Sequence, residues 1–456
     1  MTALTRPHRR GRASVARPAA FALVALAAAL VLAVPTLALA SDTTTRSAAD
    51  VQARYAQLQP AFSGSPYSVA PGLSAPYSAG SLQAGELTDG LNAINYARYL
   101  AGLPDDVSLD ATYTDRAQHG AVLLAVGQFA HSQPQPSDMA ADFYSTANSA
   151  TSSSNIGWGY GSLWSFDMGC MDDSDSSNID RLGHRRWLLD PPLLKTGMGM
   201  ANSRTDTYVF DWSRPAGFVY DSVKWPAAGY FPAEMFDAST AWSVTLNPSL
   251  YNWTSGTAGH TITLTRQRDG KTWTFTSADT DKSGEYFNFE TSGYGVNNCF
   301  IFRPNPSSVG SYVNGDVFDV TLSGGITSKA TGQPATVRYA TRFISQVEGV
   351  ATPVLVGTHT SISGPKSVKV RRTLKLSGGV SPTAATGRVT IYKQRKVSGK
   401  WRSAGAAKVS LSAGHYGYRF KPTKIGSWRF YTVYGGVSGA TVYASSRSGY
   451  RYVRVR

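Results

Sequence analysis

From residue 222 onward the sequence is a long series of short segments rich in β-branched and aromatic residues, separated by Gly, Asn and Ser. The segments expected as strands are 242–246, 261–266, 272–276, 286–290, 300–303, 317–322 and 335–344, then 367–376, 387–394, 401–410, 416–421, 426–434 and 451–456. Asp269-Gly270 stands between two alternating runs and predicts a hairpin turn. Strands of this length and spacing are typical of all-β sandwiches. We therefore predict two immunoglobulin-like sandwiches, at residues 222–348 and 352–456.

Residues 86–213 show a different pattern, with helical signals first and strand signals last. Apolar residues recur at helical spacing from Leu87 to Leu100, and Gly102 ends the run. A second helix is predicted from Ser108, as N-cap, to Gly127, and a short third one at 178–189. The polar stretch 133–154 is expected to be a loop, and strands are expected at 196–201 and 207–212. This order predicts an α+β or α/β/α layered domain.

The first forty residues have the three zones of a signal peptide. A basic start without acidic residues is followed by an apolar stretch from Phe21 to Val34 and by Ala38-Leu39-Ala40. A permanent anchor helix is the alternative, because 21–40 could just cross a bilayer of about 30 Å. Pro35 and the A-x-A step favour cleavage, so we expect an extracellular protein. Residues 41–85, rich in Ser, Ala, Thr, Pro and Gly, are expected to form a flexible leader.

Charge is distributed very unevenly along the chain. Residues 351–456 contain twenty Lys and Arg and neither Asp nor Glu, which gives +20. Residues 1–40 carry +5, so the overall +15 leaves −10 for residues 41–350. A domain this cationic attracts polyanions over a Debye length of about 8–10 Å. We expect a cell-wall polyanion or an anionic lipid as its partner, and no nucleic acid; the alternative is that the charge only keeps the domain soluble.

The chain has only two cysteines, Cys170 and Cys299. An even pair in an oxidising compartment is more often bridged than free. The sequence therefore predicts a disulfide between them, which would tie the first domain to the second.

Two histidines stand in notable segments, His131 in Phe-Ala-His-Ser and His184 in Gly-His-Arg-Arg. Either one alone is typical of a hydrogen-bonded structural histidine. Together with the run 91–95, the helix that carries His119 and the segment 195–199, they resemble the bacterial branch of the CAP superfamily. That superfamily comprises cysteine-rich secretory proteins, antigen five and pathogenesis-related proteins, and its module is also called the SCP domain. The resemblance covers residues 86–213, under a third of the chain.

The resemblance implies an α/β/α sandwich with a shallow cleft lined by two histidines and, in many members, two acidic residues. His131 and His184 match the two histidines. The family's Gly-Glu-Asn-Leu-like segment aligns with residues 153–156, so Ser154 stands where a glutamate is usual, and Asn155 follows it. Asp175 or its neighbour Asp173 is the nearest candidate for the second acid. Because a serine cannot accept a proton near neutral pH as a carboxylate does, this departure weakens an acid–base mechanism.

Three functions remain open for this cleft. As a binding module it would take a small apolar, lipid-like or glycan ligand, with the histidines as polar anchors. As a metal site it would hold Zn²⁺ through His131 and His184, with Asp173 or Asp175 as a third ligand. As a hydrolase it would activate water through His131 or His184, with such a metal. A Ser-His-Asp triad with Ser132 or Ser154 is also conceivable, although neither serine lies in a nucleophile elbow. We favour non-enzymatic binding, with a metal-assisted hydrolase as the alternative.

Overall fold

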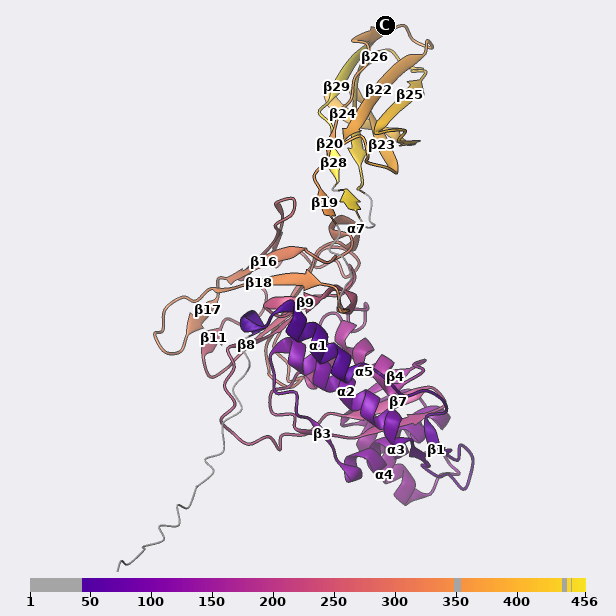
Figure 1. Ribbon diagram of the computed structural model, residues 1–456, viewed down its shortest axis with the longest axis vertical. Helices are drawn as coiled ribbons and strands as arrows, with labels where there is room; N and C mark the ends of the chain where they lie inside the picture. The colour runs from indigo at the N-terminus through magenta and orange to yellow at the C-terminus, as the bar shows by residue number, and fades with distance from the viewer. Residues whose placement is uncertain (1–42, 348–353, 437–440, 444) are drawn as a thin grey trace, which may run out of the picture. The chain divides into compact units, whose positions relative to one another are not determined.

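The computed structural model describes residues 43–347, 354–436, 441–443 and 445–456 (Figure 1). The predicted signal peptide at 1–40 lies outside these residues. The described chain contains more β-strand than helix, with the strands arranged in several sheets, and the longer helices all lie before residue 190. None of the described helices is both long and apolar enough to cross a membrane.

Residues 41–85, expected as a flexible leader, instead contain ordered elements from residue 43 onward. They form a short 3₁₀ turn (Thr43–Thr45), α1 (Ala48–Leu58), β1 (Tyr67–Val69) and β2 (Ser81–Leu82). Ser47 and Asp50 make a reciprocal capping box at the start of α1, and Arg54 pairs with Asp105 at 2.6 Å. The Ser- and Ala-rich composition concealed this helix, because packing against the rest of the fold stabilises it more than its own pattern does.

Two of the predicted helices are confirmed, with one corrected start. Helix α2 (Ala84–Ala101) ends at Gly102, whose φ of 78° is left-handed. Helix α3 (Ala111–Val126) is capped by Asp110, which accepts hydrogen bonds from the next turn, whereas Ser108 lies in β3 (Ser108–Leu109), paired with β5 (Lys195–Thr196). Helix α4 (Ala141–Thr151) replaces part of the expected loop, and α5 (Leu163–Asp172) and α6 (Gly183–Leu188) follow.

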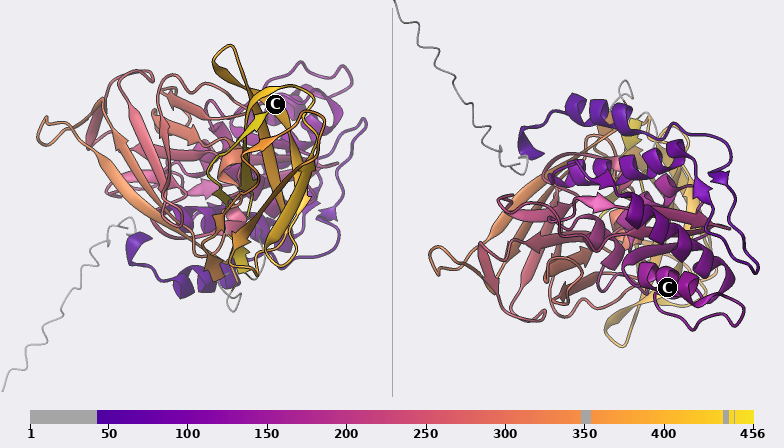
Figure 2. Two further views of the ribbon diagram at one scale, coloured as in Figure 1. Left: turned by 90° about the horizontal axis from the view of Figure 1, so that it is seen from above. Right: turned by 90° about the horizontal axis from the view of Figure 1, so that it is seen from below.

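A three-stranded antiparallel sheet stands among these helices, in the order β4 (Ser154–Trp158), β7 (Arg204–Tyr208), β6 (Met198–Ala201). Helix α3 lies directly on one face, because a Cβ at Gly199 would overlap the carbonyl oxygen of Ala117. On the other face Met198 lies beside Gly90 of α2, and Phe166 of α5 lies beside β4. Helices therefore contact both faces of this sheet, and Figure 2 shows them close together, in indigo to purple.

From residue 222 to 347 nearly all the regular elements are β-strands. One sheet has the order β14-β15-β10-β8 and another the order β13-β12-β16-β18-β9. The strands are β8 (Ser222–Trp225), β9 (Gly229–Pro232), β10 (Trp242–Leu246), β11 (Tyr251–Trp253), β12 (Thr261–Arg266), β13 (Lys271–Phe275), β14 (Tyr286–Glu290), β15 (Cys299–Arg303), β16 (Val317–Ser323), β17 (Ile326–Ser328) and β18 (Val337–Ile344). A 3₁₀ turn (Ala233–Met235) and α7 (Pro306–Val309) interrupt them.

The strand predictions for this region are confirmed, three of them to the residue: 242–246, 261–266 and 286–290. The hairpin at Asp269-Gly270 joins β12 to β13, and Gly270 has a φ of +66°. One hydrophobic core contains residues of this region, such as Trp242, together with Ile94 of α2. The helical part and the first β part are therefore packed as one body.

The last part of the chain is all-β with a core of its own. Its larger sheet has the order β21-β29-β26-β23-β24, and a smaller one the order β20-β22-β25. The strands are β19 (Val354–Val356), β20 (His359–Thr360), β21 (Ser367–Val368), β22 (Leu374–Ser381), β23 (Arg388–Val397), β24 (Lys400–Ser410), β25 (His415–Phe420), β26 (Gly426–Tyr434), β27 (Thr441–Tyr443), β28 (Ser446–Arg447) and β29 (Arg451–Val455). Leu376 of the smaller sheet packs with Ile391 and Phe430 of the larger one, so the two sheets face each other.

The predicted disulfide is wrong, because Cys170 and Cys299 are both free and buried. Cys170 lies on α5 in the main core, whereas Cys299 begins β15 and packs in a separate small cluster with Ile179 and Leu182. Burial raises the pKa of both thiols. Each cysteine therefore behaves as a small apolar core residue rather than as half of a bridge.

Candidate functional site

His131, Asn155 and His184, which the sequence singled out, line one cavity of about 270 Å³. They come from the loop after α3, from β4 and from α6. The other lining residues are Ser152, Ser154, Asn178, Arg181, Gly183, Trp187, Phe210 and Tyr294. Segments that are far apart in the sequence therefore meet at a single cleft.

His184 is held by a buried carboxylate. Its Nδ1 lies 2.8 Å from Oδ1 of Asp173, and its backbone N–H donates to Oδ2 of the same residue at 2.9 Å. The Asp173 side chain is only 2% exposed. Because Nδ1 is engaged, Nε2 is the ring nitrogen of His184 that can meet a ligand. Asp175, the preferred sequence candidate, is not a lining residue and instead accepts hydrogen bonds from Ser177 and Asn178.

The surroundings of His184 favour its protonated form. Burial alone lowers the pKa of His184, but the hydrogen bond and charge of Asp173, with the charge of Asp175 added, outweigh burial and raise that pKa above its ordinary value. A raised pKa means that the ion pair adds stability that is fully present below the ordinary pKa of about 6.5. That stability is lost as the pH rises through the raised pKa.

His131 is held by backbone rather than by an acid. Its Nδ1 lies 2.8 Å from the carbonyl oxygen of Thr151 at the end of α4. The hydroxyls of Thr151 and Ser152 donate back to the carbonyl of His131 at 2.8 and 2.9 Å. A carbonyl partner makes Nδ1 the protonated nitrogen, which leaves Nε2 as a hydrogen-bond acceptor. Asn155, 1% exposed, donates from Nδ2 to the carbonyl of His184 at 2.9 Å, so it positions α6.

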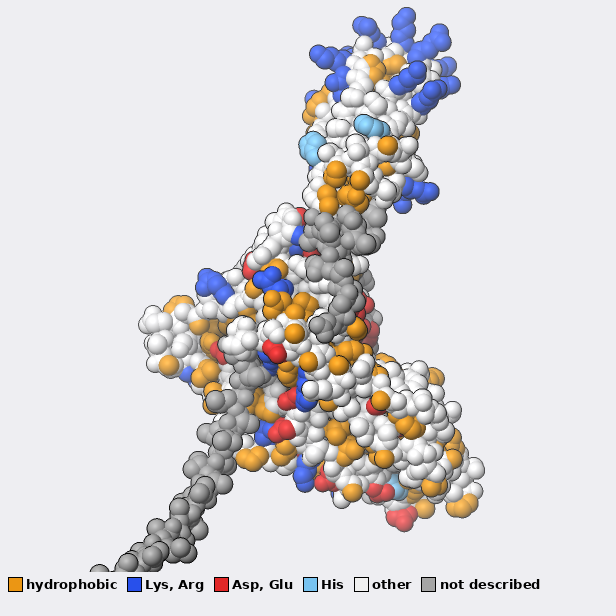
Figure 3. Space-filling model, in the orientation of Figure 1, with side chains coloured by type: hydrophobic (Ala, Val, Ile, Leu, Met, Phe, Trp, Pro, Cys, Tyr) orange, Lys and Arg blue, Asp and Glu red, His pale blue; other side chains and the backbone are white. Residues whose placement is uncertain are grey.

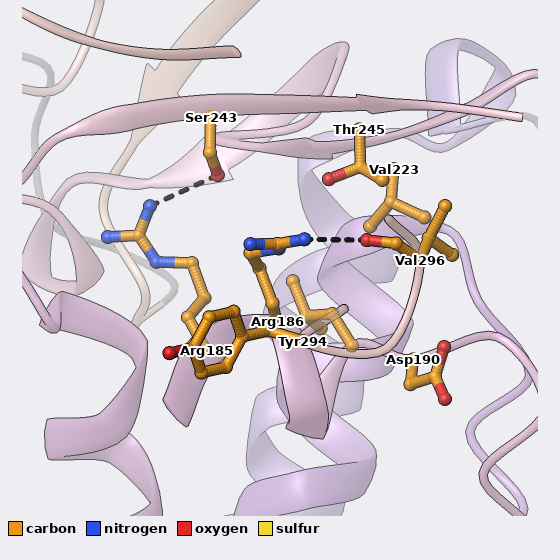
Figure 4. A pocket seen from close by; sticks show the side chains of 9 residues that line it. Arg185, Arg186, Asp190, Val223, Ser243, Thr245, Tyr294 and Val296 are labelled. Atoms are coloured by element: carbon orange, nitrogen blue, oxygen red, sulfur yellow. Dashed lines mark hydrogen bonds between the residues drawn. The ribbon is translucent and has the colours of Figure 1, made fainter. Parts of the chain in front are cut away.

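The two arginines after His184 anchor α6 to the first β part (Figure 4). Arg185 donates to the carbonyl of Ala241 at 2.7 Å and to Oγ of Ser243 at 3.1 Å. Arg186 donates to the carbonyls of Ser292 and Val296, at 2.9 and 2.6 Å. The space enclosed beside these side chains is only about 10 Å³, room for no more than one water molecule. This contact is therefore structural, and the ligand-sized space is the cavity lined by His184 and Trp187.

Tyr294 brings the first β part into the cleft. It lies in the loop between β14 and β15, and the guanidinium carbon of Arg186 is 5.3 Å from its ring centre. A Cβ at Gly183 would lie 3.0 Å from Cδ1 of Tyr294, so the ring packs closely against the start of α6. The motifs at residues 86–213 contained no signal for this residue.

An aromatic wall runs from the cleft to the surface. The ring centres of Trp187 and Phe210 are 4.4 Å apart, and Phe210 lies 5.7 Å from Trp212. Trp212 is 58% exposed. Trp187, Phe210 and Tyr294 form the apolar side of the cleft, and the histidines form its polar side.

The cleft residues do not fit a zinc ion. Across the described ranges, no three or more His, Cys, Asp or Glu side chains are grouped so as to hold a metal, and Zn²⁺ normally takes three or four protein ligands. Nδ1 of His184 is engaged by Asp173, so this histidine could offer a metal only its Nε2. Ser154, at the expected glutamate position, is 5% exposed and adjoins Asp206. Burial raises the pKa of Asp206 well above its usual range, and Ser154 offsets this only in part.

No family model matches the chain, and no curated protein matches it. Among solved structures, it is similar to the D00-D0 domain of Intimin at 12% identity, over 42% of this chain and 91% of that chain, with a TM-score of 0.14. It is similar to the D0-D1 domain of Intimin at 10% identity, over 50% and 95%, also with a TM-score of 0.14. Scores this low carry no inference about fold or function.

Proposed function

We propose that the chain is a secreted binding protein with a CAP/SCP-like domain at residues 86–213 and two immunoglobulin-like sandwiches after it. Two observations support the first assignment: helices contact both faces of the β4-β7-β6 sheet, and the motif residues His131, Asn155 and His184 line one cavity. In each β part, buried residues of two sheets share one core, which supports the assignment of two sandwiches. Export rests on the signal-peptide pattern of residues 1–40.

The cleft binds a glycan fragment without transforming it. The observation that carries this proposal is the composition of the lining: three aromatic rings, two imidazoles, two amides, two hydroxyls and one guanidinium. Its lining includes no Leu, Ile, Val or Met. A sugar packs its C–H face on an aromatic ring and hydrogen-bonds at its edges, whereas an acyl chain prefers aliphatic walls. A glycan therefore fits this cleft better than a lipid-like ligand.

A hydrolase is the second candidate, and the Asp173–His184 pair is the observation that favours it. A carboxylate that orients an imidazole is half of a familiar acid–base arrangement. Because the pKa of His184 is raised, a smaller fraction of this imidazole is unprotonated and available as a base at neutral pH. Ser154 also replaces the second expected acid. A release of new reducing ends from the probes below would support this candidate over simple binding.

The basic C-terminal part retains the protein at the cell surface. Figure 3 shows Lys and Arg side chains, in blue, gathered at one end of this part. The strand registers bring the turns 369–373, 398–399 and 421–425 to that end, together with Arg456. No carboxylate side chain occurs between residues 351 and 456 to neutralise these cations. An anionic surface is their natural partner.

The cleft assignment is tested with the full-length protein and four soluble probes. Chitotetraose, cellotetraose and trigalacturonate represent glycans, and laurate represents lipid-like ligands. Tryptophan fluorescence follows binding, since Trp187 lines the cavity. At least one glycan should bind the wild type, and His131→Ala should weaken that affinity about tenfold or more.

The matched control is His119→Ala, because His119 lies on α3 near Asp115 and outside the cavity. This variant should bind as the wild type does. Equal affinity in all three proteins, or binding of laurate alone, would contradict the proposal.

A further inference from the structure

The larger sheet of the C-terminal part has one buried and one open face. On β26, Trp428 and Phe430 point into the core, and the alternate residues Arg429 and Tyr431 point outward. Tyr392 of β23 is paired with Tyr431, and their rings stack at 4.9 Å with an angle of 9°. The outer face therefore carries aromatic side chains where an ordinary sandwich presents small polar ones.

Arginines lie between these rings. The guanidinium of Arg429 lies 4.1 Å from the ring centre of Tyr450 and 4.6 Å from that of Trp401. That of Arg447 lies 4.2 Å from the ring centre of Tyr431. A guanidinium held over a ring face by a cation–π contact keeps N–H donors that can meet a carboxylate or phosphate.

Within the described residues of this part, these arginines contact only neutral partners. Arg429 donates to Oε1 of Gln394 at 2.6 Å, and Arg454 donates to Oγ of Ser427 at 3.3 Å. No Asp or Glu occurs after residue 350. By contrast, arginines of the first part pair with carboxylates, as Arg54 does with Asp105.

A groove lies on this face. It has a volume of about 530 Å³ and is lined by Trp401, Tyr450, Tyr452, Lys396 and Arg454, among others. Tyr450 and Tyr452 remain 39% and 54% exposed. This volume lies within the range of about 300–1,000 Å³ typical of ligand sites.

We propose that this face binds an anionic glycan, a polysaccharide chain that carries carboxylate or phosphate groups. The edges of the stacked guanidinium groups hold the anions, and the exposed rings pack against sugar C–H faces. A single-stranded nucleic acid stacks successive bases on several free ring faces. Here arginines or other rings already cover Tyr431 and Tyr450, which leaves Tyr452 as the most exposed ring for a sugar face. This inference rests on the proposed surface retention and names its site and ligand class.

The test compares two pairs of charge-removing substitutions in the full-length protein. Arg429→Ala/Arg454→Ala removes two cations from the outer face. Lys375→Ala/Arg419→Ala removes two exposed cations, paired across β22 and β25, from the outer face of the opposite sheet. Tyr452→Ala changes the face without changing its charge, and a thermal melt checks that each variant folds.

Binding is measured with poly(glycerol phosphate), polygalacturonate and neutral dextran, and with single-stranded DNA and phosphatidylglycerol vesicles as the other polyanions. The wild type should bind at least one of the two anionic glycans and not dextran, and the stronger of the two shows whether phosphate or carboxylate is preferred. The face pair should weaken this binding about tenfold or more, Tyr452→Ala several-fold, and the opposite pair less than about threefold.

Three results would overturn the inference in distinguishable ways. Equal losses in the two double variants would mean that charge alone binds, and surface retention would still stand. Tighter binding of DNA or vesicles than of either glycan would show that the ligand class is wrong. A wild type that binds none of the polyanions would remove the retention role itself.

Discussion

The arginines after His184 and those on the C-terminal face use the same side chain in opposite ways. Arg185 is 1% exposed and is surrounded by backbone carbonyls of two segments. Arg429 lies on aromatic rings with one amide as its neutral partner. A guanidinium that is fully bonded to its own fold holds the fold together, whereas one that stacks on rings without a carboxylate keeps its charge available for a ligand.

The two regions also differ in what should control them. The cleft contains an imidazole paired with a carboxylate, so its electrostatics depend on pH. The charged groups of the C-terminal face are Lys and Arg, which stay protonated near neutral pH. Its electrostatics therefore depend on salt rather than on pH.

The largest effect is expected from removing a buried arginine. Arg185→Ala leaves the carbonyls of Met171 and Ala241 without their donor, and we expect it to lower the free energy of unfolding by about 3 kcal/mol or more. Arg447→Ala, on the open face, should lower it by less than about 1 kcal/mol. Urea unfolding measures both. Similar losses in the two variants would mean that the arginines do not differ as we describe.

The affinities of the two binding sites should depend differently on salt concentration. Raising sodium chloride from 50 to 200 mM should weaken binding of an anionic glycan to the C-terminal face by about tenfold, since several exposed cations take part. Binding of chitotetraose or cellotetraose, which are neutral, to the cleft should change by less than about twofold. Parallel titrations at the two salt concentrations check this. A cleft that is as salt-sensitive as the face would contradict the contrast.

The smallest effect is expected from the carboxylate behind His184. Asp173→Asn keeps the shape of the side chain but removes the charge that raises the pKa of His184. The wild type should be more stable than this variant by about 1 kcal/mol at pH 5.5. The difference should shrink as the pH rises through the raised pKa, because His184 then loses its proton in the wild type too. Unfolding curves from pH 5.5 to 9 test the sign, and a difference that grows with pH would refute it.

The sequence predicted strands correctly where they are short, alternate between apolar and polar residues or are rich in β-branched and aromatic ones, and are bounded by turn residues. Residues 242–246 and the Asp269-Gly270 hairpin are examples. Helices α1, α4 and α5 were not predicted, because each has only 10 or 11 residues and a helix this short depends on packing against neighbours more than on its own pattern. The disulfide prediction failed because parity and compartment say nothing about whether two thiols face each other.

The sequence predicted only part of the candidate site. Local motifs pointed to His131 and His184, and the structure places both on one cavity. Asp173 could not be separated from Asp175, since the choice depends on how the end of α5 turns toward His184. Tyr294 could not be predicted from the sequence, because it lies in the loop between β14 and β15, far from the motifs of residues 86–213. For the C-terminal part, the sequence predicted only a large positive charge. The strand register was needed to show which aromatic rings lie on the same face as the arginines.

The central claim is that the cleft holds a glycan through its two histidines. Histidine-selective ¹⁵N NMR of the full-length protein, titrated with chitotetraose, cellotetraose and trigalacturonate, tests it most directly. We expect at least one of these glycans to shift the Nε2 resonances of His131 and His184 and to leave those of His119 unchanged. Titrations in which no glycan shifts either cleft histidine, or in which His119 moves as much as they do, would contradict the account.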